Sequence, residues 1–235
     1  NPFDSTTLVL DNCSFLNNDA IYGTGGGVNF LPGNCHGKLE ISEVVFKNNS
    51  ADNAGGALLI GQSTAGGVSE VNGEALIERS LFENNFASYG AAIYIDYLGF
   101  VNLNYCSVVK NISDTSSQFS AGGGVYMRSM GVINLNLNHS TISENVGVQG
   151  GAVYFLQQTD TGSININNCT IFGNHCSVGG GVHTTPYWNG NPICSTFVKG
   201  SILSNNGDSV FSGVANAVIT SSGYNVFSDS IGFST

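Results

Sequence analysis

Carboxylates are the side chains in this sequence that could act in catalysis. Hydrolysis of a sugar polymer needs two carboxyl groups on either side of one bond, about 5 to 9.5 Å apart. The candidates are Glu40, Glu43, Glu74 and Glu78. Glu43 aligns with Arg79, and an exposed ion pair of this kind contributes little to stability. We therefore expect these carboxylates to be surface charges rather than a catalytic pair.

A lyase would need a different set of residues, a Lys or Arg base together with acidic calcium ligands. Asp96 and Arg128 are the nearest such pair. The four histidines are scattered and no Cys-x-x-Cys pair occurs, so a zinc site is not expected. The sequence thus predicts no catalytic residue, no metal and no cofactor, with a polysaccharide hydrolase or lyase as the alternative.

A row of aromatic residues is the more prominent surface feature. One outward position of four consecutive segments holds Tyr94, Tyr126, Tyr154 and His183. Rings stacked about 4.8 Å apart would stabilise neighbouring strands through cross-strand pairs. The other interpretation is a flat platform for sugar rings or a partner subunit, as in a carbohydrate-binding module. Tyr187 and Trp188 follow in a loop and could extend the platform.

Two motifs alternate along almost the whole chain. In the first, an apolar residue is followed three places later by Asn, as in Phe15/Asn18, Phe46/Asn49, Phe82/Asn85, Val108/Asn111, Ile142/Asn145, Ile171/Asn174 and Ile202/Asn205. In the second, small residues precede an aliphatic one, at residues 25–28, 55–58, 90–93, 122–125, 150–153, 179–182 and, weakened, 213–215. Successive copies lie roughly 26 to 36 residues apart, a period typical of solenoids.

The segment before each Asn motif alternates between apolar and polar residues, which predicts a strand with one buried face. Its two inward positions hold Leu8, Leu39, Ala75, Val101, Leu135, Ile164 and Ser195, then Leu10, Ile41, Ile77, Leu103, Leu137, Ile166 and Phe197. A small residue follows at Cys13, Val44, Ser80, Cys106, Ser140, Cys169 and Gly200. Equivalent residues can repeat in this way only if equivalent strands stack in parallel. The sequence therefore predicts an all-β parallel β-helix of about seven coils.

The repeated asparagines are expected to be structural. Amide side chains at the same corner of every coil can stack into a hydrogen-bonded ladder along the axis. Asn also tolerates the left-handed backbone that a sharp corner requires. We assign the ladder to Asn18, Asn49, Asn85, Asn111, Asn145, Asn174 and Asn205.

Composition excludes several classes of protein. Only 9% of the 235 residues are charged, and six Lys and Arg against sixteen Asp and Glu give a net charge of −10. Nucleic-acid binding needs clustered cations, so it is disfavoured, as is binding of an anionic polysaccharide. No apolar run approaches the ~20 residues of a membrane helix. A surface of Asn, Ser, Thr and Gly is typical of rigid extracellular β-structure.

The alternating motifs resemble those of the chlamydial polymorphic membrane proteins. They stand here as GGAL at residues 55–58, GGAV at 150–153, FKNN at 46–49 and FENN at 82–85. The resemblance covers essentially the whole chain. It implies a right-handed parallel β-helix, secretion, and an adhesive or surface-structural role.

Cysteines and sequons give further expectations. Cys13, Cys106 and Cys169 share the small inward position in coils too far apart for a disulfide, so we expect buried thiols. Cys176 and Cys194 flank one loop and could form a disulfide. Sequons stand at Asn12, Asn48, Asn111, Asn138 and Asn168.

The sequons differ in their expected accessibility. Asn12 and Asn168 should lie on the outer side of a bend, which makes them the better candidates for glycosylation, with Asn48 and Asn138 next. Asn111 falls on the ladder and should be unavailable.

We expect one β-helix domain over residues 1–235, with an irregular terminal coil over 207–235. The first coil begins without an amphipathic cap, so we expect the chain to be part of a longer protein or to be covered by another subunit. The predicted function is a secreted, non-catalytic structural or adhesive component of a cell surface or extracellular filament. The predicted partners are other subunits, including copies associating end to end, and carbohydrate.

Overall fold

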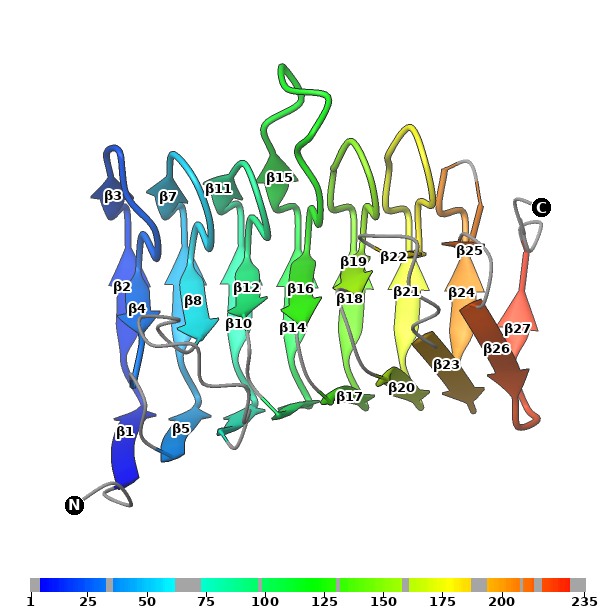
Figure 1. Ribbon diagram of the computed structural model, residues 1–235, viewed down its shortest axis with the longest axis horizontal. Coiled ribbons are helices and arrows are strands. Elements are labelled where there is room, and N and C mark those ends of the chain that lie inside the picture. Colours follow the sequence, from blue (N-terminus) through cyan, green and yellow to red (C-terminus); the bar gives the residue numbers. More distant parts are fainter. Residues whose placement is uncertain are drawn as a thin grey trace.

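The protein is a right-handed parallel β-helix, in which each coil of the chain lies beside the coil before it (Figure 1). The computed structural model describes residues 5–32, 36–61, 73–96, 99–129, 132–157, 161–186, 194–207, 209–213 and 217–228. All strand pairs between named strands in these ranges are parallel and join equivalent positions of neighbouring coils. This confirms the predicted fold class.

Four parallel sheets form the walls of the helix. The first sheet contains β1 (Ser5–Asp11), β5 (His36–Ser42), β9 (Glu74–Glu78), β13 (Phe100–Asn104), β17 (Ile133–Asn138), β20 (Gly162–Asn167), β23 (Cys194–Lys199) and β26 (Ala217–Ser221). The second contains β2 (Ser14–Leu16), β6 (Val45–Lys47), β10 (Leu81–Glu83), β14 (Ser107–Val109), β18 (Thr141–Ser143), β21 (Thr170–Phe172), β24 (Ile202–Ser204) and β27 (Val226–Phe227).

The other two sheets complete each coil. The third sheet is short and contains β3 (Asp19–Ala20), β7 (Ser50–Ala51), β11 (Phe86–Ala87) and β15 (Ile112–Ser113). The fourth contains β4 (Val28–Phe30), β8 (Leu58–Gly61), β12 (Ile93–Asp96), β16 (Val125–Ser129), β19 (Val153–Gln157), β22 (Val182–Pro186) and β25 (Phe211–Gly213). Within the described ranges, β26 and β27 continue the first and second sheets into the last segment of the chain.

Like residues stack on like residues inside the helix. Leu10, Ile41, Ile77 and Leu103 are directly paired from coil to coil, as predicted. Phe15, Phe46 and Phe82 stack with ring centroids 5.1 and 4.8 Å apart. From the second coil onward these inward side chains are almost completely buried. One continuous apolar core therefore runs along the axis.

The asparagine ladder runs through the interior at the corner after the second sheet. The side-chain oxygen of Asn111 accepts hydrogen bonds from the backbone N–H and the side-chain amide of Asn85, both at 2.9 Å. The Asn111 amide in turn donates to the Asn145 oxygen and to the carbonyl of Phe82. The same pattern links Asn18, Asn49, Asn85, Asn111, Asn145, Asn174 and Asn206.

The left-handed backbone lies one residue before each ladder asparagine, contrary to our expectation. Asn48, Asn84 and Lys110 have φ near +55°, whereas the buried ladder residues that follow them do not have a positive φ. A ladder residue must point its side chain inward, and the exposed residue before it makes the corner. The two roles that we assigned to one asparagine therefore belong to two neighbouring residues.

Polar groups at the small inward position are paired as well. The hydroxyl of Ser140 accepts a hydrogen bond from the N–H of Cys106 and donates to the carbonyl of Asn138. Ser80 and Ser201 do the same in their coils. The Cys106 and Cys169 thiols are buried and contact backbone carbonyls. These serine and cysteine side chains thus join two coils at the bend where the backbone ladder is interrupted.

The glycine motif is explained by the tight corner before the fourth sheet. Gly55 has φ +65°, in the left-handed region that favours glycine. A Cβ on Gly56 would lie 2.3 Å from the carbonyl oxygen of Phe86 and 2.4 Å from that of Ala91. The third residue, Ala57, is buried against the core. Close contact between coils therefore requires very small residues here.

The seventh coil differs from the prediction by one residue. Ile164 pairs with Thr196 and Ile166 with Val198, so Ser195 and Phe197 point outward rather than inward. The same shift continues along the chain: Ser201 replaces Gly200 at the small position, Leu203 replaces Ile202, and Asn206 replaces Asn205 in the ladder. A slip of one residue exchanges the two faces of a strand.

The register was predicted wrongly because both faces of the strand in the seventh coil carry apolar residues. Phe197 and Ile202 are as hydrophobic as Val198 and Leu203, so periodicity alone did not separate them. The structure selects the register in which Ser201 and Asn206 provide hydrogen bonds to the sixth coil. Gly200 and Asn205 then occupy the left-handed corners, with φ of 59° and 52°.

The ladder can be tested with Asn111→Ala. The substitution removes the acceptor for two donors of Asn85, and a buried donor left unpaired costs about 1–3 kcal/mol. We expect a loss of at least about 3 kcal/mol in the free energy of unfolding, measured by urea denaturation. Asn29→Ala, at an exposed strand position, is the control. Equal stability of the two variants would contradict the role of the ladder.

The register of the seventh coil can be tested with two neighbouring substitutions. Val198→Asp would place a carboxylate in the core, whereas Phe197→Asp would place it at a side chain that is 40% exposed. We expect the first variant to be unfolded or to melt far below the wild type, and the second to melt close to it. The reverse order of thermal midpoints would restore the original register.

Candidate functional site

The predicted aromatic row lies on the outer face of the fourth sheet. Tyr94 of β12 pairs with Tyr126 of β16, which pairs with Tyr154 of β19, and His183 of β22 follows. The ring centroids are 5.0, 5.1 and 5.3 Å apart and the rings are stacked. Because the strands are in register, the rings form one column parallel to the helix axis.

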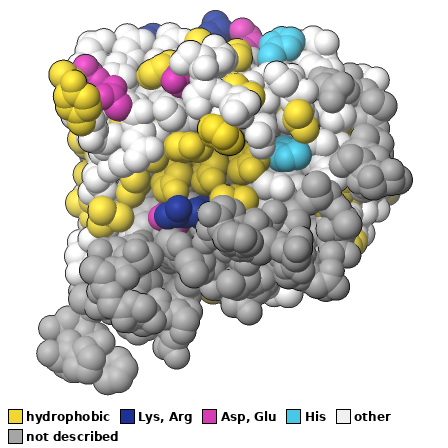
Figure 2. Space-filling model, turned by 45° about the horizontal axis from the view of Figure 1, so that its top comes forward, with side chains coloured by type: hydrophobic (Ala, Val, Ile, Leu, Met, Phe, Trp, Pro, Cys, Tyr) yellow, Lys and Arg dark blue, Asp and Glu magenta, His cyan; other side chains and the backbone are white. Residues whose placement is uncertain are grey.

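These rings are packed against one another rather than displayed to solvent. Only 6 to 8% of each side chain is exposed. Tyr126 and Tyr154 each have an aromatic neighbour on both sides, and Tyr89 packs edge-on against Tyr126 at 5.5 Å. Figure 2 shows hydrophobic side chains gathered in a patch on this side of the molecule. The ring faces that a sugar would stack on are therefore occupied by neighbouring rings.

Burial also determines the protonation of this row. It raises the pKa of the Tyr126 and Tyr154 hydroxyls well above the ordinary value. It lowers the pKa of His183 to about 4, and the His183 Nδ1 is hydrogen-bonded to the hydroxyl of Ser212. At neutral pH Tyr126, Tyr154 and His183 are therefore uncharged. Tyr187 and Trp188, which we expected to extend the row, lie outside the described residues.

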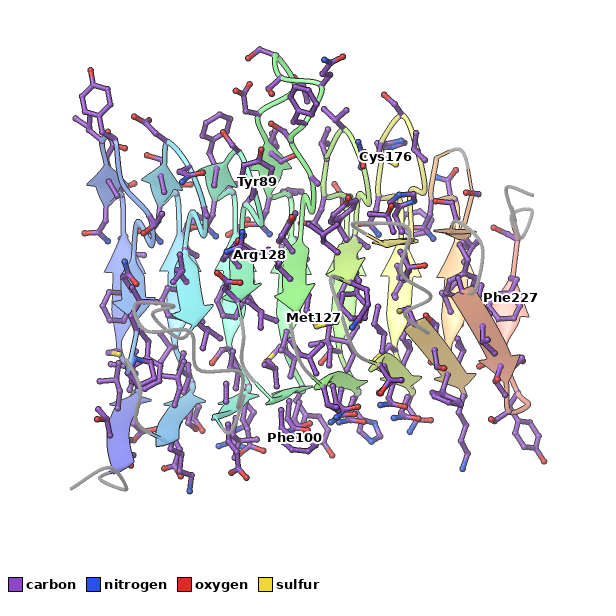
Figure 3. All side chains as sticks on the ribbon, viewed as in Figure 1. Tyr89, Phe100, Met127, Arg128, Cys176 and Phe227 are labelled. Atoms are coloured by element: carbon purple, nitrogen blue, oxygen red, sulfur yellow. The ribbon has the colours of Figure 1, made fainter. Side chains whose placement is uncertain are left out.

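An ion pair borders the aromatic row. The Arg128 guanidinium donates to both carboxylate oxygens of Asp96, at 2.8 and 2.5 Å, from the next coil (Figure 3). Burial raises the pKa of Asp96, and the hydrogen bonds and charge of Arg128 act in the opposite direction. Asp96 is the only carboxylate on the described strands of this sheet. With both oxygens paired to Arg128, Asp96 is not arranged as one of two glycosidase carboxyl groups.

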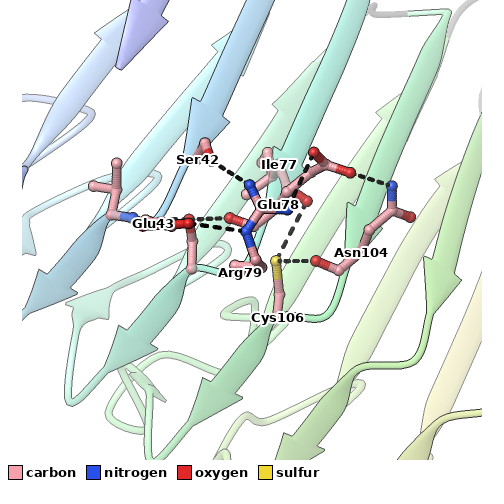
Figure 4. Close-up of polar contacts among 9 residues, drawn as sticks. Ser42, Glu43, Ile77, Glu78, Arg79, Asn104 and Cys106 are labelled. Carbon is pink, nitrogen blue, oxygen red and sulfur yellow. Dashed lines mark hydrogen bonds and ion pairs between the residues drawn. The ribbon is translucent and has the colours of Figure 1, made fainter. Parts of the chain in front are cut away.

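The remaining acidic candidates are surface residues with partners of their own (Figure 4). Arg79 lies 3.2 Å from Glu43, as predicted, and 3.6 Å from Glu78, and it also donates to the hydroxyl of Ser42. Glu78 accepts a hydrogen bond from Asn104, and Glu40 lies 2.6 Å from Lys38. Glu74 is exposed on β9. These contacts between exposed groups contribute little to stability.

A second surface, on the first sheet, was not predicted. Eight polar side chains project from β13, β17 and β20 in three rows, and we call them the amide face: Asn102, Asn104, Asn134, Asn136, Asn138, Ser163, Asn165 and Asn167. Exposed aromatic residues lie around it, namely Phe100, Tyr105 and Phe197. The alternating asparagines were visible in the sequence, but Phe197 was assigned to the core.

The glycosylation candidates fall into two groups. Asn12, Asn48 and Asn168 are exposed and each has a positive φ. Asn138 belongs to the amide face, where its side chain is hydrogen-bonded to Asn104 and Asn167. Asn111 is fully buried in the ladder.

The predicted disulfide between Cys176 and Cys194 is not formed. Cys194 has a free and buried thiol at the start of β23, and burial raises its pKa far above the ordinary value. Cys176 lies in the turn between β21 and β22, near the upper corner of the coil in Figure 3. Sequence proximity did not reveal that a whole strand of the fourth sheet separates the two residues.

Within the described ranges, no three of the His, Cys, Asp and Glu side chains come together as metal ligands. The described part of the chain also has no helix with the length and apolar character that a membrane crossing requires.

Comparison with known proteins identifies the repeat. The Chlamydia polymorphic membrane protein repeat family matches residues 43–61 and 79–96. Each match runs from the first bend, through the second and third sheets and the ladder asparagine, to the end of a fourth-sheet strand. The matched unit thus contains the bend before the second sheet, the asparagine corner and the glycine corner of one coil. No curated protein and no solved structure matched the chain.

The protonation of His183 predicts a specific acid sensitivity. The unfolded chain would bind a proton at this residue below about pH 6.5, whereas the folded chain would not do so until about pH 4. The free energy of unfolding should therefore decrease as the pH falls through this window, by on the order of 3 kcal/mol. Urea denaturation at several pH values measures the effect.

The control for this prediction is His183→Asn, which keeps a polar side chain near Ser212 but has no group that titrates in this range. The pH dependence should become flatter in the variant. A wild-type protein whose His183 ring titrates near its ordinary pKa, measured by NMR, would contradict the prediction.

Proposed function

We propose that this right-handed parallel β-helix, a repeat protein of the polymorphic membrane protein type, is a non-catalytic structural or adhesive component of a cell surface or extracellular filament. The family that matches it is described as a Chlamydia membrane protein repeat. Secretion and a place outside the cell are part of the proposal. The low fraction of charged residues supports this location.

One observation carries the proposal: equivalent residues form unbroken columns along the outside as well as the inside of the helix. The Tyr94 to His183 column and the rows of the amide face each extend across consecutive coils. Stacked repeats produce long, flat surfaces of uniform chemistry, which suit binding to an extended partner. A catalytic site would instead need unlike groups that converge on one bond.

The described residues favour binding over catalysis in a second respect. Asp96 is held by Arg128, and the acidic residues near Arg79 are exposed and paired. Five of the six basic residues lie within 4.0 Å of an acidic partner: Lys38, Lys47, Arg79, Lys110 and Arg128. The chain therefore offers no basic stripe for nucleic acid. The partners we propose are other surface or filament subunits, including copies of itself, and carbohydrate.

The test combines location with activity. Antibodies against the folded protein should label intact, non-permeabilised cells that produce it. The purified protein should release no soluble product from a panel of neutral and acidic glycans. Labelling that appears only after permeabilisation would refute the surface location. Product release that Asp96→Asn abolishes would show a polysaccharide-active enzyme instead.

A further inference from the structure

The amide face is a regular array of polar groups on the first sheet. Asn102, Asn136 and Asn165 are directly paired in one row, and Asn104, Asn138 and Asn167 in the next. Asn134 and Ser163 form a third row, which begins at Phe100. Neighbouring strands are about 4.8 Å apart and alternate residues on one strand about 6.6 Å. The array therefore presents amide groups at fixed intervals in two directions.

Hydrogen bonds within each row fix the orientation of the amide groups but do not use all of their donors and acceptors. Asn136 donates to Asn102 and accepts from Asn165, both at 2.8 Å. Asn138 donates to Asn104 at 2.9 Å and accepts from Asn167 at 3.0 Å. An amide has two N–H donors and an oxygen with two lone pairs. By this count, Asn136 and Asn138 each retain one donor and one acceptor for a ligand.

Exposed aromatic residues border the array. Phe100 is 50% exposed and begins the row of Asn134. Its side chain projects beyond the sheet in Figure 3. Tyr105, 59% exposed, follows Asn104 at the bend, and its ring stacks on His139 with centroids 4.9 Å apart. Phe197, 40% exposed, ends the row of Asn165. Unlike the Tyr94 to His183 column, these rings are accessible to solvent.

Charge distinguishes this surface from the rest of the molecule. None of the eight residues of the amide face is charged. Charged residues lie beyond the ends of its rows: in the strand register, Glu78 is next to Asn104, Glu74 is next to Phe100 and Lys199 is next to Asn167. The net charge of −10 also repels polyanions. Amides that can bind vicinal hydroxyls, with aromatic rings at the border, suit a neutral sugar polymer.

We propose that the amide face binds an extended, neutral polysaccharide of the flat-ribbon type, with the polymer lying along the helix axis. Such a chain crosses β13, β17, β20 and β23, a distance of about 14 Å. Its hydroxyls pair with the free donors and acceptors of Asn136 and Asn138. Tyr105 and Phe197 contact the sugar rings near the border. This inference rests on the proposed function and names the ligand of its adhesive surface.

The experiment is a pull-down of the purified chain with microcrystalline cellulose and with chitin, at low and at high salt. We expect binding to at least one of the two polymers with no loss at high salt, because no ion pairs are involved. Pectate, a polyanion, should not retain the protein. Absence of binding to both neutral polymers, or binding only to pectate or only at low salt, would overturn the inference.

Two variants and two matched controls locate the site. Tyr105→Asn keeps a residue that tolerates the positive φ and should reduce binding about tenfold. Tyr22→Asn is its control, since Tyr22 is also exposed and has a positive φ, in the turn after β3. Asn136→Asp should weaken binding similarly because it removes both N–H donors of the amide and adds a negative charge, whereas Asn29→Asp on the fourth sheet should not.

The outcomes separate this inference from the proposed function. Wild-type binding by both Tyr105→Asn and Asn136→Asp would exclude the amide face as the site. Should Asn136→Asp fail to fold, as judged by circular dichroism, Tyr105→Asn decides alone. A protein that labels intact cells but binds neither neutral polymer refutes only the ligand. A protein found only inside cells refutes the proposed function, whatever the pull-down shows.

Discussion

The structure depends on the need to hydrogen-bond every buried backbone group where the chain changes direction. Along the flat walls, parallel strands satisfy one another. At the corner after the second sheet the strands are interrupted, and the ladder asparagines supply the missing partner. The oxygen of Asn145 accepts from both the backbone and the side chain of Asn111. Because an unpaired buried donor is costly, the same residue must stand at this corner in each coil.

This internal constraint determines the outer surface. When the inward residues of successive coils are in register, the outward residues are in register too. The fourth sheet therefore aligns Tyr94, Tyr126 and Tyr154, and the first sheet aligns the asparagines of the amide face. Rings in such a column cover one another's faces, whereas amides in a row retain free hydrogen-bonding groups. The same stacking thus hides aromatic faces on one side and displays polar groups on another.

Electrostatics follow from the same geometry. Opposite charges in equivalent positions of adjacent coils face each other, as in the pairs Arg128–Asp96, Arg79–Glu43 and Lys47–Glu83. These three pairs use half of the six basic residues, and the acidic excess is distributed over the surface. The resulting protein is uncharged on its amide face and negative overall.

The sequence by itself determined the parallel β-helix, because the repeat period, the alternating strand and the recurrent asparagine each require stacked coils. It also located the Arg79–Glu43 pair and the aromatic column. It did not determine the register of the seventh coil, since Phe197 and Val198 are both apolar and only the hydrogen bonds of Ser201 and Asn206 distinguish the two alternatives.

Accessibility was decided only by the tertiary structure, because it depends on what neighbouring coils place beside each side chain. Tyr126 and Tyr105 look alike in the sequence, yet Tyr126 is 6% exposed and Tyr105 59%. The absence of the expected disulfide was likewise decided by the path of the chain around a coil, since the fourth-sheet strand β22 lies between Cys176 and Cys194. The sequence thus specifies which residues stack, and the packing of whole coils specifies which of them a partner can reach.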